Sequence, residues 1–252
     1  MMIFCQKFGT PYIDGVPVAP GTMYDFVGPR SPKISLGDTV PGKEVTWILA
    51  GGVLIADCNL LRNVGWNHLN RSDLVFGKRI ELDGHSYKVR LLRRGKDDGP
   101  SEWDNLLSVV GSSTDLLHMD DIWSLGADTD PEDEKFRYCW GKDTGNDTFV
   151  YFNDQAPKHG WRPVLEMPNL NHGPVTSLIG ESVVICGRAQ GVVRGVVSDA
   201  TEYDLILKNA CANTRRGENE RFMHIRDEGL VVNLDEVRAI HLWDITREVK
   251  KI

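Results

Sequence analysis

Short hydrophobic runs alternate with polar turns throughout the last third of the chain. These runs are rich in β-branched residues and recur about every 8–12 residues, which is typical of a small antiparallel β-structure. Gly195 interrupts one of them, and a glycine at such a place marks a bend or bulge. The pattern predicts a small β-barrel whose strands are 182–186, 191–197, 203–207, 222–225, 230–233 and 237–242.

The preceding part, from about residue 20 to 168, mixes helix and strand patterns. Residues 45–50 and 53–56 are strand-like, and Asp83-Gly84 between two alternating runs predicts a β-hairpin. A serine, early acids and apolar residues at helical spacing predict a capped helix over 101–110. Regular patterns fade between 112 and 158, so we expect mostly irregular structure there. Together these signals predict an α+β domain.

A segment rich in proline, asparagine and glycine, at 168–174, separates the part with mixed helix and strand patterns from the part with short strand patterns. Residues 172–252 carry 11 Lys/Arg and 12 Asp/Glu, a net charge of −1, whereas the rest carries 18 and 24, a net of −6. All tryptophans except Trp243 precede this segment. We therefore expect two domains, 1–168 and 172–252.

Two short motifs of the first domain resemble a known fold. Val89-Arg-Leu-Leu92 followed by Gly99-Pro-Ser-Glu-Trp-Asp104, and later Gly160-Trp-Arg-Pro-Val-Leu165, resemble motifs of the C-type lectin-like fold. The branch is the one shared by formylglycine-generating-type domains and phage variable receptor proteins. The resemblance implies an α+β domain with a long irregular ligand-facing region, and a bacterial or phage origin. No catalytic residue carries over, because the catalytic cysteines of the formylglycine branch have no matching motif here.

The second domain resembles the Sm-like family, a version of the SH3-like barrel. Arg194-Gly-Val-Val-Ser-Asp199 with Asp204-Leu-Ile-Leu207 is similar to the first family motif, and Gly229-Leu-Val-Val-Asn233 to part of the second. The resemblance implies a barrel that assembles into oligomers and binds RNA. Asp204, however, stands where the family has a base-contacting asparagine, and the Arg-Gly of the second motif is missing. Assembly is therefore better supported than RNA recognition.

The tryptophans of the first domain fall into two groups. Trp66, Trp123 and Trp140 lie in polar stretches and could form a flat stacking platform for a ligand, with core packing as the alternative. The others lie in apolar segments and are predicted to pack in the core: Trp47, Trp103 and Trp161. Arg162, between apolar neighbours, is expected to pair with an acid.

Acidic residues gather in residues 115–134, which hold eight Asp or Glu and no Lys or Arg. Such a cluster could supply oxygen ligands for Ca²⁺, but it lacks the spacing of an EF-hand. A solvated acidic face is the alternative, so we predict no metal. The acids taken as ligand-facing candidates are Asp128, Asp130, Asp143 and Asp147.

Charge and motif content narrow the function. A net charge of −7 argues against a protein that coats nucleic acid. Arg215 and Arg216 are the candidate RNA contacts if the barrel binds RNA; an exposed soluble loop is the alternative. The sequence contains no HExxH or GxSxG motif and no phosphate-binding glycine loop before a helix. We therefore predict neither catalysis nor a cofactor.

The remaining sequence features concern location. The longest apolar stretch falls well short of about 18 residues, so we expect no membrane span. The N-terminus is a poor signal peptide, and the five scattered cysteines do not suggest a disulfide framework. These features favour the cytoplasm, or a virion if the chain is phage-encoded.

The sequence thus predicts a non-catalytic binding protein. Its first domain would display an irregular surface, rich in tryptophan and acids, to an unknown protein or small ligand. The barrel would mediate assembly, as in a homo-oligomer, or make a second contact. The alternative is an Sm-like oligomeric RNA-binding protein with an accessory N-terminal domain.

Overall fold

Strands dominate the computed structural model, which describes residues 3–25, 31–96, 99–111, 116–141, 147–188, 191–213 and 221–249. Of the described residues, 47% lie in strands and 11% in helices. The chain divides into two units, Phe4–Glu166 and Met1–Ile3 with Met167–Ile252.

The predicted α+β, C-type lectin-like class of the first domain is wrong. Its described part holds two short α-helices, α1 (Trp66–Arg71) and α2 (Glu102–Val110), beside three sheets. Much of the error lies in residues 112–158, which contain β11 (Trp123–Thr129), β12 (Phe136–Trp140) and β13 (Asp147–Tyr151). The glycine and acids of this region obscure its period-two alternation, which becomes visible only when the strands pair.

The first sheet of the N-terminal unit has the order β1-β6-β7-β15-β10-β9. Its strands are β1 (Cys5–Phe8), β6 (Val45–Ala50), β7 (Val53–Ala56), β9 (Lys78–Leu82), β10 (His85–Arg90) and β15 (Val164–Glu166). The predicted strands 45–50 and 53–56 are confirmed by β6 and β7. The predicted hairpin is also confirmed, because Asp83 and Gly84 join β9 to β10 with φ values of 49° and 79°.

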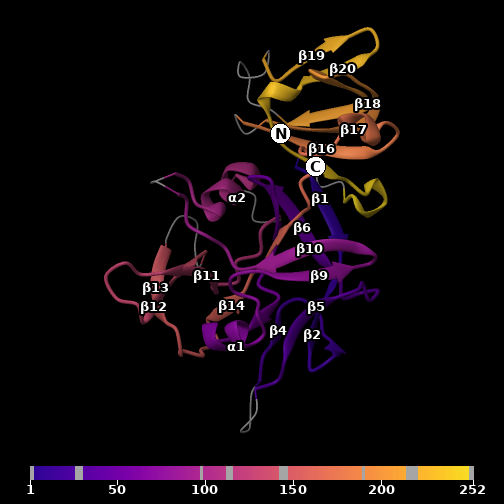
Figure 1. Cartoon of the computed structure of the whole chain (residues 1–252). Helices are drawn as coiled ribbons and strands as arrows, with labels where there is room; N and C mark the ends of the chain where they lie inside the picture. Colours follow the sequence, from indigo (N-terminus) through magenta and orange to yellow (C-terminus); the bar gives the residue numbers. More distant parts are fainter. Residues whose placement is uncertain are drawn as a thin grey trace. The chain divides into compact units, whose positions relative to one another are not determined.

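The second sheet has the order β13-β12-β11-β14-β8-β4 (Figure 1). Its remaining strands are β4 (Thr22–Met23), β8 (Leu61–Arg62) and β14 (His159–Trp161). A third sheet, ordered β3-β2-β5, contains β2 (Thr10–Ile13), β3 (Val16–Pro17) and β5 (Ile34–Gly37). The predicted helix over 101–110 is α2, which begins after a capping box formed by Ser101 and Asp104.

The core of this unit contains Trp47, Trp103 and Trp161, each at most 2% exposed, as predicted. Arg162 is fully buried as well, but the prediction that it pairs with an acid is wrong. Its guanidinium donates to Ser124 Oγ at 2.9 Å and to two backbone carbonyls. Among the described residues no carboxylate lies within ion-pair distance of it, so neutral oxygens replace the expected acid.

The C-terminal unit contains one sheet, ordered β19-β20-β18-β17-β16-β21. Its strands are β16 (Ser182–Gly187), β17 (Val192–Ala200), β18 (Asp204–Asn213), β19 (Met223–Arg226), β20 (Gly229–Asn233) and β21 (Val237–Leu242). Short 3-10 helices lie at η1 (Val175–Leu178), η2 (Leu234–Glu236) and η3 (Ile245–Arg247). The pairing of β17 with β18 shifts register at Gly195, which confirms the bulge predicted there. The Sm-like assignment stays a prediction.

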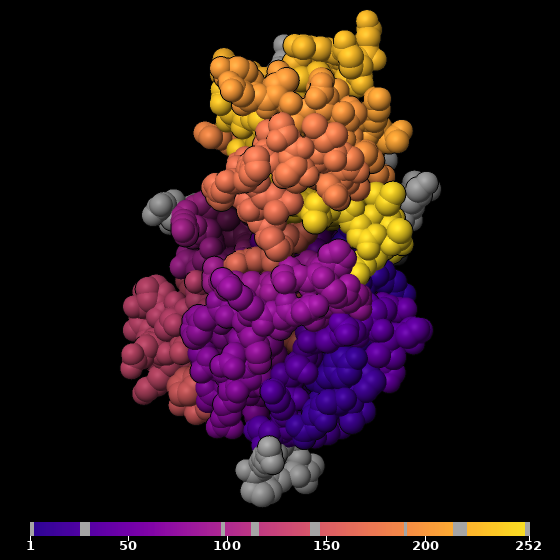
Figure 2. Space-filling view, turned by 45° about the vertical axis from the view of Figure 1, so that its right-hand side comes forward, coloured from indigo at the N-terminus to yellow at the C-terminus, as the bar shows by residue number. Residues whose placement is uncertain are grey.

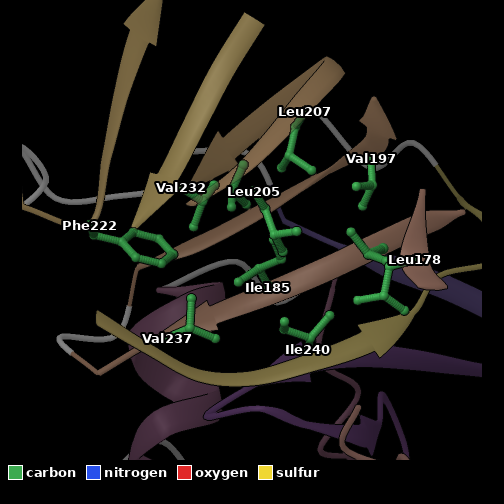
Figure 3. Close-up of a cluster of buried hydrophobic side chains, with 11 residues drawn as sticks. Leu178, Ile185, Val197, Leu205, Leu207, Phe222, Val232, Val237 and Ile240 are labelled. Carbon is green, nitrogen blue, oxygen red and sulfur yellow. The ribbon is translucent and has the colours of Figure 1, made fainter. Parts of the chain in front are cut away.

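One apolar cluster fills this second unit (Figure 3). It draws side chains from β16, β17, β18, β20 and β21, so every strand of the sheet except β19 contributes. Phe222, just before β19, is buried at the same core. The cluster consists of Leu178, Val183, Ile185, Val193, Val197, Leu205, Leu207, Phe222, Val232, Val237 and Ile240.

Candidate ligand-binding site

The antiparallel strands β11, β12 and β13 carry the most distinctive surface of the N-terminal unit. On β12, aromatic residues alternate with Arg137 and Cys139, so the two faces of the strand differ in chemistry. The β12–β13 region lies at the surface of its unit (Figure 2). Sites built from these strands are therefore accessible from solvent.

Aromatic rings pair across β12 and β13 on one face. Phe136 lies opposite Tyr151 with ring centroids 6.0 Å apart, and Tyr138 lies opposite Phe149 at 4.4 Å. Phe149 and Tyr151 are each 40% exposed. The guanidinium carbon of Arg94 sits 4.4 Å above the Tyr138 ring. This face joins aromatic surface to a cation, which suits stacking contacts.

Arg137 lies on the opposite face of β12, between two further rings. Its guanidinium carbon is 4.5 Å from the centroid of Trp66 and 5.7 Å from that of Phe152. One terminal nitrogen donates to the carbonyl oxygens of Glu134 and Phe136. Burial lowers the pKa of Arg137, and the charge of Glu134 opposes this shift only in part. The Arg137 side chain is thus a cation that two aromatic rings partly shield from water.

The Arg137 guanidinium also has unused hydrogen-bonding capacity. Its Nε is buried and has no hydrogen-bond partner. Among the described residues, no carboxylate lies within 4.0 Å of its nitrogens. A buried donor without a partner is unfavourable by about 1–3 kcal/mol. An anion in front of Arg137 cannot reach this buried nitrogen, but it would be attracted by the positive charge of the guanidinium.

A pocket of about 470 Å³ opens at this position. It is bounded by the end of β11, the turn that leads into β12, and the end of β13. It is lined by one hydroxyl residue, one acidic residue, two basic residues and two aromatic residues: Thr129, Glu134, Lys135, Arg137, Tyr151 and Phe152.

The three tryptophans of the predicted platform do not form one exposed surface. Trp66 and Trp140 are 5% and 3% exposed, and Trp123 is half-buried on β11. Both buried rings contact Gly126: Trp66 Nε1 donates to its carbonyl at 3.0 Å, and a Cβ there would lie 2.3 Å from Trp140 Cζ3. Only glycine leaves room for the Trp140 ring at this position. Trp66 borders the site because its ring supports Arg137.

The predicted acids do not converge on one point. Asp128 accepts a hydrogen bond from the backbone N–H of Arg94 at 2.7 Å, and Asp130 accepts from that of Glu132 at 2.9 Å. Asp147 is exposed at the start of β13. Asp143, like Arg215 and Arg216, lies outside the described residues. Within the described part of the chain, no group of three or more His, Cys, Asp or Glu side chains could hold a metal ion.

No protein-family model matches the chain, and no curated protein or solved structure is significantly similar to it. Within the described residues, no helix is long and apolar enough to cross a membrane.

Sequence reasoning missed the basic and aromatic residues that line the pocket. Arg137, Tyr151 and Phe152 stand in segments whose only visible signal was alternation of aromatic residues. That signal was available in Phe136-Arg-Tyr-Cys-Trp140, where every second residue is aromatic. The acidic residues on both sides of this segment indicated cation binding instead.

Proposed function

We propose that the chain is a non-catalytic binding protein whose N-terminal unit holds a small anionic ligand in the pocket beside Arg137. The observation that carries the proposal is the half-buried Arg137 side chain at the pocket wall, a cation that lacks a carboxylate partner among the described residues. Lys135 adds a second cation at the pocket wall. An anion is the class of ligand that both groups would stabilise.

The pocket walls also favour a ligand with a flat or apolar part. Tyr151 and Phe152 lie at the pocket with ring centroids 4.9 Å apart. A volume of about 470 Å³ falls within the range of small-molecule sites, about 300–1,000 Å³. Small aromatic carboxylates combine the two properties and are suitable probes.

The proposal is tested by titrating the full chain with benzoate while recording amide resonances. Benzamide, which has nearly the same shape without the charge, is the matched probe. We expect benzoate to shift the signals of Thr129, Arg137 and Tyr151, and to bind at least about tenfold more tightly than benzamide, since a hydrogen bond to a charged group is worth about 1.5–3 kcal/mol.

Variants separate this site from general charge effects. Arg137→Gln and Lys135→Gln should each weaken benzoate binding, whereas Arg79→Gln, on an exposed position of β9, should leave it unchanged. Circular dichroism verifies that each variant is folded. Equal binding of benzoate and benzamide, or full binding by folded Arg137→Gln protein, would contradict the proposal.

The proposal includes a reducing compartment, the cytoplasm. All five cysteines are thiols, and three of them are buried. Burial raises the pKa of Cys139 to about 12 and that of Cys186 to about 11, which keeps both in the unreactive protonated form. Five thiols in one chain are typical of proteins in reducing compartments.

A further inference from the structure

Strand β19 forms an edge of the C-terminal sheet (Figure 1). Among the described strands it pairs only with β20. It contains neither a proline nor a register shift, two of the devices that protect sheet edges. Ile225, in the middle of this edge, is 86% exposed. An apolar side chain so exposed at a sheet edge suggests a surface that is covered by a partner.

The hydrogen bonds of the β19–β20 hairpin determine which backbone groups point outward. The N–H of Asn233 donates to the carbonyl of Phe222 at 2.9 Å, so this pair is hydrogen-bonded. Hydrogen-bonded and non-hydrogen-bonded pairs alternate along an antiparallel ladder. His224 and Arg226 therefore bond to β20 as well, whereas the N–H and C=O groups of Met223 and Ile225 point away from it.

We propose that β19 pairs with β19 of a second copy of this chain, antiparallel, with Met223 opposite the partner's Ile225. This inference does not depend on the ligand pocket, which lies in the other unit. Because the two-fold axis repeats each contact, Ile225 also lies opposite the partner's Met223. Every outward-pointing backbone group of Met223 and Ile225 then has a partner. In a register that places Met223 opposite the partner's Met223, Ile225 lies opposite a residue outside the partner's β19. A register that places Ile225 opposite itself does the same to Met223.

The same register brings apolar side chains together. Met223 already packs against the core cluster of its own unit, and Ile225 lies on the same face two residues further on. Pairing places Ile225 directly against the partner's Met223, so the core cluster continues across the interface. Ile225, the most exposed large apolar side chain among the described residues of this unit, becomes buried.

Charges at both ends of the pair support a second copy as the occupant. Continued by two residues, past Phe222 opposite the partner's Arg226, the register brings Arg221 to the partner's Asp227, and the symmetry repeats this contact at the other end. Both residues are exposed and adjoin β19. Both residues lie in turns beside the strand, where nearby opposite charges attract each other and like charges repel. The outward backbone groups, the pair of Met223 with Ile225 and the charges at the two ends of this edge therefore match those of a second copy.

The proposal is tested by analytical ultracentrifugation of the full chain, from low to several hundred micromolar. We expect a monomer–dimer equilibrium. Ile225→Lys should weaken it at least about tenfold, because it replaces a buried apolar contact by a charge at the edge. Tyr203→Lys, which changes another exposed side chain of the same unit, should leave it unchanged.

A charge exchange tests the register itself. Arg221→Asp and Asp227→Arg should each weaken the dimer, because each variant brings two like charges together at both ends. The double variant, which restores opposite charges, should recover the wild-type dissociation constant. Both positions are exposed turn residues, and circular dichroism checks that the variants are folded. A chain that is monomeric throughout, a dimer indifferent to Ile225→Lys, or a double variant that fails to recover would overturn the proposal.

Discussion

At the scale of single residues, Arg90 shows how this chain stabilises a buried charge. The side chain is almost fully buried on β10. Glu102, at the start of α2, accepts two hydrogen bonds from it, and Glu166, at the end of β15, accepts another. Burial alone lowers the pKa of Arg90, but its hydrogen bonds to both carboxylates, together with their charges, outweigh that effect and raise the pKa. One cation thus ties two strands to a helix.

The same network makes stability depend on pH. Burial alone raises the pKa of Glu166, yet hydrogen bonds and charge from Arg90 and Lys88 outweigh it, so this pKa lies below its usual 4.5. A group with a lowered folded pKa adds stability above the unfolded value, and that stability is lost as pH falls through the folded value. Glu166→Gln should therefore be about 1.5 kcal/mol less stable near pH 7, as expected for hydrogen bonds to a charged group.

Urea unfolding at a series of pH values measures this effect. The difference between wild type and Glu166→Gln should shrink as pH falls below about 4.5. Glu81→Gln, on an exposed position of β9, is the control and should follow the wild-type curve. A difference that is constant from pH 7 to pH 3 would show that Glu166 stabilises the fold by packing and not by its charge.

At the scale of elements, the β9–β10 hairpin depends on two residues in the left-handed region. Asp83 and Gly84 both have positive φ, as a two-residue turn of this type requires. The Asp83 carboxylate also accepts hydrogen bonds from the N–H and hydroxyl of Thr39. The turn is therefore connected to a neighbouring loop as well as to its own strands.

Gly84→Ala should destabilise the chain by about 1 kcal/mol. A Cβ at Gly84 would meet nothing within 4 Å, so the expected cost comes only from the backbone conformation, with φ near 79°. Gly173→Ala is the matched control, because a Cβ there would make only an ordinary contact with the Leu170 carbonyl oxygen at 3.8 Å, and Gly173 does not have a positive φ. Thermal unfolding should show a lower Tm for the first variant only. Equal melting of both would contradict the conformational argument.

Elements with strong local signals were the ones that could be predicted from sequence. The Asp83-Gly84 turn and the Ser101 cap each need only a few neighbouring residues, so both were found. Strand β12 was not predicted, because the alternation of aromatic and other residues along it becomes recognisable as a strand only when β11 and β13 pair with it. The α+β class failed for the same reason: it rested on the local helix and strand patterns, whereas the sheets join segments that are far apart in the chain.

At the scale of the whole molecule, the candidate site shows why function was harder to predict than structure. The Arg137 guanidinium takes its environment from Trp66 on α1 and from Phe152 after β13. These residues are about 70 and 15 positions away in the sequence. Without related proteins to align, nothing in the sequence marks them as neighbours. Of these three residues, only Trp66 was predicted from the sequence to contribute, as part of a surface for ligand stacking, and its burial does not fit that role.

The division of the chain also leads to a prediction about where the second domain begins. Three hydrogen bonds join residues 168–170 to β21: His241 Nδ1 lies 2.8 Å from the carbonyl oxygen of Pro168, Leu170 N–H donates to Ile240 O, and Ile240 N–H donates to Asn169 Oδ1. A fragment of residues 167–252 keeps these bonds, whereas one of residues 172–252 loses them. The core cluster lies entirely within both fragments.

We expect the fragment 167–252 to fold and to unfold cooperatively in circular dichroism. Each lost hydrogen bond is worth about 0.5–1.5 kcal/mol, and about 1 kcal/mol shifts the Tm of a domain of this size by about 4–8 °C. The fragment 172–252 should therefore melt at least about 5 °C lower, and Asn169→Ala in the longer fragment should account for part of that difference. If the two fragments melted together, the domain would begin after this segment. If neither folded, the core cluster would need the N-terminal unit, and the two units would not be independent domains.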